Sequence, residues 1–389
     1  MMDDLSFILN QWGEERASYL QSVVPPIFQT AMFSSKNVAE MRELLRREAE
    51  QPFYTRGNNP TTDILRKKVA ALEKAEDALI FSSGSAAIAA AVMVHLKAGD
   101  HVVSVRKPYS WTNKLFTVFL PRFGIETTLI DGHEAQNYEK ALRPSTKLLY
   151  LESPNSWTFE QQDIAAVVAI AQKHGLVTVM DNSWAGPLYQ NPLEMGVDLV
   201  AHSATKYMAG HSDTIAGVVC GRQAMIRKIF ASEYMTLGGV ISPFNAWLLL
   251  RGLRTLPVRM DYISRSTTKI IDFLEHHPKV DRVYHPFAQS YAQPALTQKQ
   301  LLRGTGLFSV VVKAPDIPAV ECFCDALQRF LLAVSWGAYE SLIFPACTLY
   351  ASEIYQSPDL PWNMLRMSIG LEDPDLLIAD LEQALDKLP

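Results

Sequence analysis

Two residues of this sequence, Lys206 and Asp181, follow apolar runs and carry side chains suited to one kind of chemistry. Lys206 ends the segment S-A-T-K (203–206), which comes after the apolar run 197–201, and Asp181 ends the run L-V-T-V-M-D (176–181). A lysine that forms a Schiff base and an acid that pairs with a pyridinium nitrogen are what pyridoxal phosphate (PLP) requires from its protein. The pair therefore indicates a PLP site.

The same part of the chain offers groups for a phosphate. Ser203 and Thr205 supply hydroxyls, and S-S-G (82–84) precedes a run typical of an apolar helix. Phosphate is bound by hydroxyls and by the unsatisfied backbone N–H groups at the start of a helix. We expect Ser203, Thr205 and the backbone of Gly84 and Ser85 to bind the phosphate.

Length and composition narrow the class of protein. A chain of 389 residues predicts two domains and a terminal arm, and 48% hydrophobic with 20% charged residues is typical of a soluble globular protein. A net charge of −5 argues against nucleic-acid and anionic-membrane partners. The sequence has no apolar run of the roughly 18–20 residues that a membrane span needs, and its N-terminus is acidic. We expect a cytoplasmic protein.

Cysteine and histidine spacing does not indicate a metal site. Cys322 and Cys324 form a C-x-C pair in a predicted helix, without the C-x-x-C spacing or the second half of a zinc site. His202 and His211, near the lysine segment, have no H-E-x-x-H context. We predict reduced structural thiols and no bound metal.

From about 61 to 250, helical and strand-like runs alternate. Near-continuous apolar strands separated by helices predict an α/β fold with a mostly parallel sheet covered on both faces. Ligands of such sheets bind beyond the carboxyl ends of the strands, where Ser83, Ser153 and Asp181 are expected. We expect strands at 78–83, 101–105, 125–130, 147–152 and 176–181, and helices at 63–75, 85–96 and 164–174.

We expect three regions: an extended arm at 1–60, a large PLP-binding domain at 61–250 and a smaller α+β domain at 251–389. Pro257 falls within a long amphipathic pattern and predicts a kink or a break there. The elements expected outside the large domain are helices at 37–50, 243–277, 317–330 and 374–388, and strands at 306–312 and 364–370.

Several sequence strings, which follow one another over nearly the whole chain, resemble the trans-sulfuration enzymes of cysteine and methionine metabolism. These are PLP enzymes of fold type I, the aspartate aminotransferase-like fold. Within that family the chain looks most like the bacterial cystathionine β-lyase branch, because L-E-S-P-x-S and S-W-G-x-Y-E-S-L take the form of that branch. The strings are Y-T-R-G-N-N-P-T (54–61), L-E-S-P (151–154), M-D-N-S-W-A (180–185), A-T-K-Y-M-A-G-H-S-D (204–213), R-G-L-R-T-L (251–256), S-W-G-A-Y-E-S-L-I (335–343) and R-M-S-I-G-L-E-D (366–373).

The resemblance implies roles for residues around the cofactor. Lys206 would bind PLP and remove the Cα proton of the substrate, and Asp181 would keep the ring nitrogen protonated. Tyr109 would stack on the ring and assist proton transfer. Tyr54 and Arg56 would bind the phosphate in a neighbouring subunit. At least a homodimer follows, and the family usually forms a dimer of dimers.

The resemblance also implies which residues bind the substrate. Arg366 matches the arginine that binds the substrate α-carboxylate, while Ser335, Trp336 and Ser156 match residues that line the pocket. The expected reaction is α,β-elimination of L-cystathionine, or of a related sulfur amino acid, to pyruvate, ammonia and homocysteine or another thiol. Such an enzyme would serve methionine biosynthesis.

Three departures bear on specificity. Gly57 stands where the best-known β-lyases have a second arginine, whose charged hydrogen bond is worth about 1.5–3 kcal/mol. Val334 stands where synthase-like members have glutamate, and the bulky Trp111 either narrows the substrate channel or belongs to the core. The alternatives are a γ-active relative (cystathionine γ-synthase, cystathionine or methionine γ-lyase, or homoserine-ester sulfhydrylase) and, from another class, a non-catalytic PLP-binding module.

Overall fold

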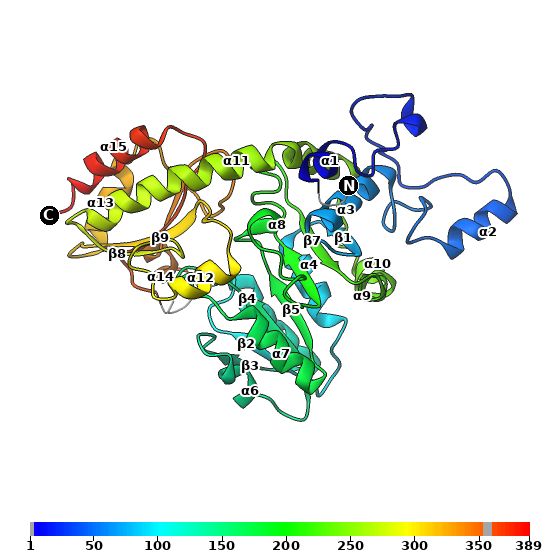
Figure 1. Ribbon diagram of the computed structural model, residues 1–389, viewed down its shortest axis with the longest axis horizontal. Coiled ribbons are helices and arrows are strands. Elements are labelled where there is room, and N and C mark those ends of the chain that lie inside the picture. Colours follow the sequence, from blue (N-terminus) through cyan, green and yellow to red (C-terminus); the bar gives the residue numbers. More distant parts are fainter. Residues whose placement is uncertain (1–3, 353–359) are drawn as a thin grey trace. The chain divides into compact units, whose positions relative to one another are not determined.

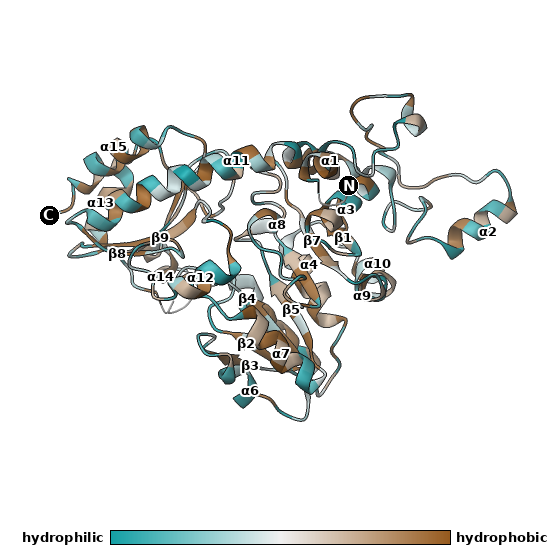
Figure 2. Ribbon diagram, in the orientation of Figure 1, coloured by the Kyte–Doolittle hydropathy of each residue, from teal (hydrophilic) through white to brown (hydrophobic). Residues whose placement is uncertain are grey.

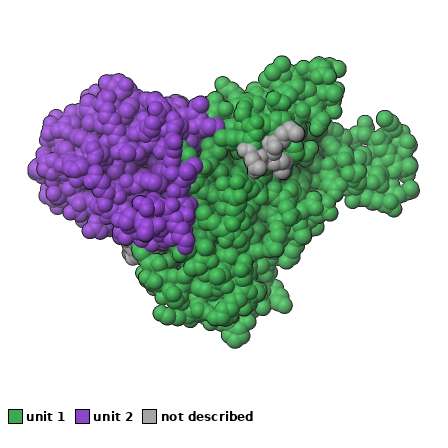
Figure 3. All heavy atoms as spheres, viewed as in Figure 1, with its two compact units in different colours: residues 1–153, 162–209, 213–255 green, residues 154–161, 210–212, 256–389 purple. Residues whose placement is uncertain are grey.

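The computed structural model of the chain describes residues 4–352 and 360–389, which divide into two compact units (Figure 3). Unit 1 extends to residue 255 but leaves out the segments 154–161 and 210–212. Those two segments join 256–389 in unit 2. Each unit is built around its own sheet.

Unit 1 contains a seven-stranded sheet in the order β1-β7-β6-β5-β4-β2-β3. The pairs from β6 to β3 are parallel, whereas β7 is antiparallel to both β1 and β6. The mostly parallel sheet of an α/β fold is therefore confirmed. The strands are β1 (Asp77–Phe81), β2 (His101–Val105), β3 (Glu126–Ile130), β4 (Thr146–Glu152), β5 (Val177–Asp181), β6 (Leu199–His202) and β7 (Gly217–Gly221).

Helices cover both faces of this sheet. On one face Leu148 of β4 packs with Ala87 of α4, and on the other Leu149 packs with Val167 of α7. Figure 1 shows α7 beside β4 and β5, and Figure 2 shows these elements largely in the hydrophobic colour. The helices of unit 1 are α1 (Leu5–Asn10), α2 (Val38–Arg46), α3 (Pro60–Leu72), α4 (Gly84–Met93), α5 (Ser110–Lys114), α6 (Gln136–Lys140), α7 (Ile164–His174), α8 (Gly186–Tyr189), α9 (Gln223–Ile229) and α10 (Met235–Leu237).

A buried ion pair fixes the start of the chain to α3. The Nζ of Lys68 lies 3.1 Å from an Oε of Glu14, and both side chains are almost fully buried. Lys68 also donates to the backbone carbonyls of Ile8 and Leu9 at the end of α1. The ammonium group is therefore satisfied by a carboxylate and two carbonyls, which a buried charge requires.

Unit 2 contains a five-stranded sheet in the order β10-β11-β12-β9-β8. Its neighbouring strands are antiparallel except for the short β10–β11 pair. Val320 of α13 and Leu381 of α15 pack in one apolar core with Phe308 of β9. The elements are β8 (Val280–Tyr284), β9 (Leu307–Val312), β10 (Leu331–Leu332), β11 (Leu342–Pro345), β12 (Met364–Ser368), α12 (Pro294–Gln300), α13 (Ile317–Ala326), α14 (Cys347–Tyr350) and α15 (Pro374–Leu385).

Some details differ from the sequence-based expectation. The helix α11 (Pro243–His276) continues through Pro257, which therefore does not end it. The helix expected at 317–330 ends at Ala326, because Leu327 takes an extended backbone conformation; β10 follows at Leu331. β7 was not expected, because glycine stands at both of its ends. Among the described residues, no helix is both long and apolar enough to cross a membrane.

Candidate functional site

The residues expected to bind the cofactor lie where strands of unit 1 end. Asp181 is the last residue of β5, and Lys206 lies just beyond β6. Gly84 begins the helix that follows β1, and Tyr109 immediately precedes α5, which follows β2. This is the edge of an α/β sheet at which ligands bind.

Asp181 is held in a buried position with one oxygen fixed. The side chain of the residue two positions on, Ser183, donates to Asp181 Oδ1 at 2.6 Å, and its backbone N–H donates to the same oxygen at 2.8 Å. Burial raises the pKa of the Asp181 carboxyl above its ordinary value of 3.8, although the Ser183 bonds and the charges of His202 and Lys206 act in the opposite direction. A cation beside the carboxylate would offset the cost of burial, and a pyridinium ring supplies one.

Ser183 also joins the acid to the lysine segment. The backbone N–H of Ser203 donates to the Ser183 hydroxyl at 2.6 Å, so one hydroxyl links Asp181 to 203–206. The sequence analysis did not single out Ser183. A hydroxyl residue two positions after an aspartate at a strand end is a turn signal, and that pattern was the available clue.

The start of α4 forms a tight contact with the lysine segment. Ser83 caps the helix by accepting from the Ala86 N–H at 3.1 Å, while the first N–H groups of an α-helix have no acceptor within it. A Cβ atom at Gly84 would lie 2.8 Å from the Cβ of Ser203. The N–H groups of Gly84 and Ser85 and the hydroxyl of Ser203 therefore belong to one small region, whose donors suit a phosphate.

Thr205 has a structural task in this turn. Its hydroxyl accepts from the Ala216 N–H at 3.0 Å and donates to the Ala216 carbonyl at 3.2 Å. The next residue, Lys206, donates its backbone N–H to the Ser203 carbonyl at 3.1 Å. Thr205 thus fixes the turn that presents Lys206, and phosphate binding by its hydroxyl stays a prediction.

Tyr109 is positioned by a carboxylate that the sequence analysis did not consider. Glu152, at the end of β4, accepts from the Tyr109 backbone N–H at 2.7 Å, and its backbone pairs with that of Asp181. The Tyr109 side chain is 39% exposed. An anchored backbone with an accessible ring is compatible with the expected stacking role, which stays a prediction.

Tyr54 and Arg56 lie in the loop before α3 and are both exposed. The guanidinium carbon of Arg56 lies 5.4 Å from the centre of the Tyr54 ring. Among the described residues, neither side chain hydrogen-bonds to another cofactor candidate. The single chain thus leaves both accessible, as the proposed donation to a neighbouring subunit requires.

The four substrate-side candidates belong to unit 2. Arg366 lies on β12 and donates to the backbone carbonyl of Val334, next to Ser335 and Trp336. Ser156 lies in the segment 154–161, beside a tryptophan whose ring packs on the guanidinium of Arg366. Ser335, Trp336 and Ser156 are all half-buried. The unit therefore gathers Arg366 with the loop that carries Ser335 and Trp336.

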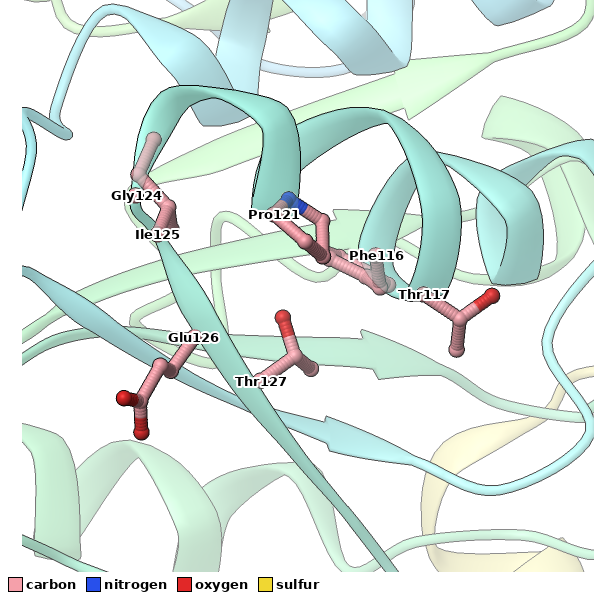
Figure 4. Close-up of a pocket in the computed structure, with 7 residues that line it drawn as sticks. All are labelled: Phe116, Thr117, Pro121, Gly124, Ile125, Glu126 and Thr127. Atoms are coloured by element: carbon pink, nitrogen blue, oxygen red, sulfur yellow. The ribbon is translucent and has the colours of Figure 1, made fainter.

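A hollow of about 530 Å³ lies elsewhere in unit 1, near β3 (Figure 4). None of its lining residues is a site candidate, so it is not the expected PLP site. No cluster of three His, Cys, Asp or Glu side chains within 4–352 and 360–389 is arranged to hold a metal. The hollow is lined by Phe116, Thr117, Pro121, Gly124, Ile125, Glu126 and Thr127.

The groups at the strand ends of unit 1 fit PLP. They provide a lysine beyond β6, a buried carboxylate that needs a cation, and helix-start donors in contact with Ser203. The Gly84 contact leaves no room for a side chain, so glycine is required for α4 to approach the lysine segment this closely.

Comparison with known proteins supports the same cofactor. The sequence model of the family described as Cys/Met metabolism PLP-dependent enzyme matches residues 8–386. The chain is 36% identical to an L-methionine gamma-lyase of Treponema denticola, over 94% of this chain and 93% of that protein. It is 37% identical to a cystathionine gamma-lyase of Bacillus subtilis, over 86% of this chain and 89% of that protein. The structure of metB from Corynebacterium glutamicum aligns with a TM-score of 0.91 and 33% identity, over 99% of this chain and 98% of that one.

Proposed function

Because the chain belongs to the Cys/Met metabolism PLP-dependent enzymes, we propose that it cleaves sulfur amino acids by α,β-elimination, with L-cystathionine as the leading substrate. The family match and the named relatives support the broader assignment, a PLP-dependent carbon–sulfur lyase. The products would be pyruvate, ammonia and homocysteine. A related sulfur amino acid would release its own thiol in place of homocysteine.

The observation that carries the β-elimination proposal is Trp336, within the string that resembles the β-lyase branch. The residue after it, Gly337, has φ of +84° and donates its N–H to Ser368 Oγ at 3.1 Å. On its other side, the Val334 carbonyl accepts from Arg366. The backbone on both sides of Trp336 is thus anchored to β12, the strand that carries the proposed carboxylate ligand Arg366.

The proposed mechanism divides the work between the two sets of residues. Arg366 binds the α-carboxylate, and the amine of Lys206 removes the Cα proton. When bound, PLP withdraws electrons from Cα, and Asp181 favours this by stabilising positive charge at the ring nitrogen. The Cβ–S bond then breaks, a thiolate leaves, and water converts the remaining fragment into pyruvate and ammonia. Tyr109 would assist the proton transfers.

γ-Elimination is the second candidate, because the similar proteins are named gamma-lyases. It requires a second proton removal, at Cβ, for which Lys206 is again the available base. The packing of Trp111 does not distinguish β-elimination from γ-elimination. This residue is 48% exposed, so it is not part of the core of the single chain. Its effect on a substrate channel stays a prediction.

Two one-sulfur substrates distinguish the candidates. S-methyl-L-cysteine has its C–S bond at Cβ, and L-methionine has it at Cγ. The proposal predicts pyruvate and methanethiol from the first at a much higher kcat/KM than 2-oxobutyrate from the second. The reverse ratio would establish the γ-lyase candidate, and binding of PLP with no turnover of any amino acid would favour a non-catalytic module.

We make three further proposals. The exposed Tyr54 and Arg56 bind the phosphate of a neighbouring subunit, so the enzyme works as a homodimer or a dimer of dimers. The segment 1–60 serves as the arm that reaches that subunit, before the cofactor domain at 61–250 and the C-terminal domain at 251–389. The enzyme acts in the cytoplasm.

A further inference from the structure

The guanidinium group of Arg366 lies against a pair of aromatic rings that pack on each other. Its central carbon is 5.2 Å from the centre of the Trp157 ring and 5.1 Å from that of Phe344. The two ring centres are 5.5 Å apart, with the planes tilted by 45°. Phe344, on β11, is the direct cross-strand partner of Arg366 on β12. Trp157 instead comes from the separate segment 154–161 of the same unit.

Trp157 is held in an unusual backbone conformation. Its φ is +67°, in the left-handed region that bulky residues rarely adopt. The Oδ1 of Asn155 accepts from the backbone N–H of Glu160 at 3.0 Å and from the Thr158 hydroxyl at 3.2 Å. The indole also packs on a small apolar cluster formed by Val311, Ala346 and Met364. The loop therefore supports a conformation that costs energy and directs this ring onto Arg366.

We propose that Trp157 is a positioning residue that holds Arg366 in place for the α-carboxylate of the substrate. This inference rests on the proposed function, in which Arg366 is the carboxylate ligand. A guanidinium carries its N–H donors in its plane, so two rings packed on one side of the group restrict its rotation, while donors directed away from the rings remain for a carboxylate. The rings also attract the cation directly.

The role predicts a particular kinetic signature. Every amino-acid substrate has an α-carboxylate, so weakening this contact raises KM by a similar factor for all of them. The reacting bonds lie elsewhere on the substrate, so kcat changes little. A tryptophan that only filled space would instead affect protein stability, and one that contacted the substrate side chain would change the ranking of substrates.

Two substitutions at position 157 separate ring attraction from apolar bulk. Trp157→Phe keeps an aromatic face, and Trp157→Leu keeps an apolar side chain without one. In the holoenzyme we expect Trp157→Leu to raise KM about three- to tenfold for both S-methyl-L-cysteine and L-methionine, to the extent that each is turned over. Trp157→Phe should lie close to the wild type. Trp362→Leu, another half-buried tryptophan of unit 2, is the matched control and should leave KM unchanged.

Phe344→Leu removes the second ring and keeps the test valid if a variant at 157 fails to fold. The expected result is again a raised KM for all substrates with a nearly constant kcat. Unchanged KM values in folded Trp157→Leu and Phe344→Leu enzymes would overturn the inference, as would a change confined to one substrate. The keto acid released decides between β- and γ-elimination independently, so failure of that proposal is recognised separately from failure of this one.

Discussion

The Nε2 atom of His202 lies 2.6 Å from Oε1 of Glu73, and both side chains are almost fully buried. Glu73 follows α3, while His202 ends β6, directly after the residue that pairs with Asp181. The second carboxylate oxygen of Glu73 has no hydrogen-bond partner among the described residues. The histidine is therefore a main contact of this carboxylate.

Removing Glu73 should destabilise the protein strongly. Removing one partner of a buried pair leaves the other partner unpaired, at a cost of about 3–5 kcal/mol. We expect Glu73→Ala to lower the free energy of unfolding in urea by about that amount, and Glu73→Gln by less, since its amide can still bond to His202. Glu194→Ala, which breaks the exposed pair with Lys74, is the control and should cost less than about 1 kcal/mol. Equal losses in the two alanine variants would contradict this account of the buried pair.

Asp181 should make the stability of the cofactor-free protein depend on pH. Burial raises the pKa of this carboxyl above 3.8, so between 3.8 and the raised value the folded state binds more protons than the unfolded state. This contribution to stability is present below that range and is lost as the pH rises through the folded-state pKa. The side chain of Asp181→Asn is neutral at every pH, so the free energy of unfolding of this variant should not show this decline. Its PLP-dependent turnover should fall sharply. Parallel pH profiles for the two cofactor-free proteins would show that burial does not act on this group as described.

Because Gly84 lies in close contact with Ser203, we expect even the small substitution Gly84→Ala to lower the affinity for PLP. A methyl group there would lie 2.8 Å from Ser203 Cβ, and overpacking of this kind typically costs about 1–3 kcal/mol. Gly84→Ala should therefore bind PLP more weakly, measured as the dissociation constant from a fluorescence titration. Ser85→Ala changes only an exposed side chain and should bind as the wild type does. Weakened binding in Ser85→Ala alone would mean that a side chain, rather than the helix backbone, holds the phosphate.

Mixed subunits test whether the site is shared. Lys206→Ala should lose at least about 100-fold in turnover, because it removes the acid–base group. Arg56→Ala should retain the lysine but hold PLP less firmly. If Arg56 serves a neighbouring subunit, heterodimers of these two variants contain one site with both wild-type residues and should recover part of the activity. Absence of recovery in verified heterodimers would indicate that each subunit completes its own site.

The sequence was sufficient to predict the α/β fold, because apolar strands and capped helices are local patterns. It also placed Lys206 and Asp181 correctly at strand ends. Ser183 was missed because its role depends on two contacts that form only when β5 and β6 lie side by side. β7 was missed for a steric reason: a side chain at Gly217 would collide with the carbonyl of Ser83, so close packing requires glycine in that strand.

The pair Glu73 and His202 and the pair Trp157 and Arg366 were beyond sequence reasoning for a related reason. Their members are far apart in the chain, and each residue by itself has an ordinary explanation as a polar cap or a buried aromatic. Only the folded arrangement shows that the carboxylate meets an imidazole and that the indole covers a guanidinium. Long-range contacts of this kind leave no spacing pattern in the sequence.

The most direct test of the proposed reaction is to identify the keto acid that the PLP-loaded enzyme releases from L-cystathionine. This substrate carries a β and a γ carbon–sulfur bond on one sulfur, so the enzyme itself selects between them. The account predicts pyruvate together with homocysteine. Release of 2-oxobutyrate together with cysteine would contradict it and would assign the chain to the γ-eliminating lyases.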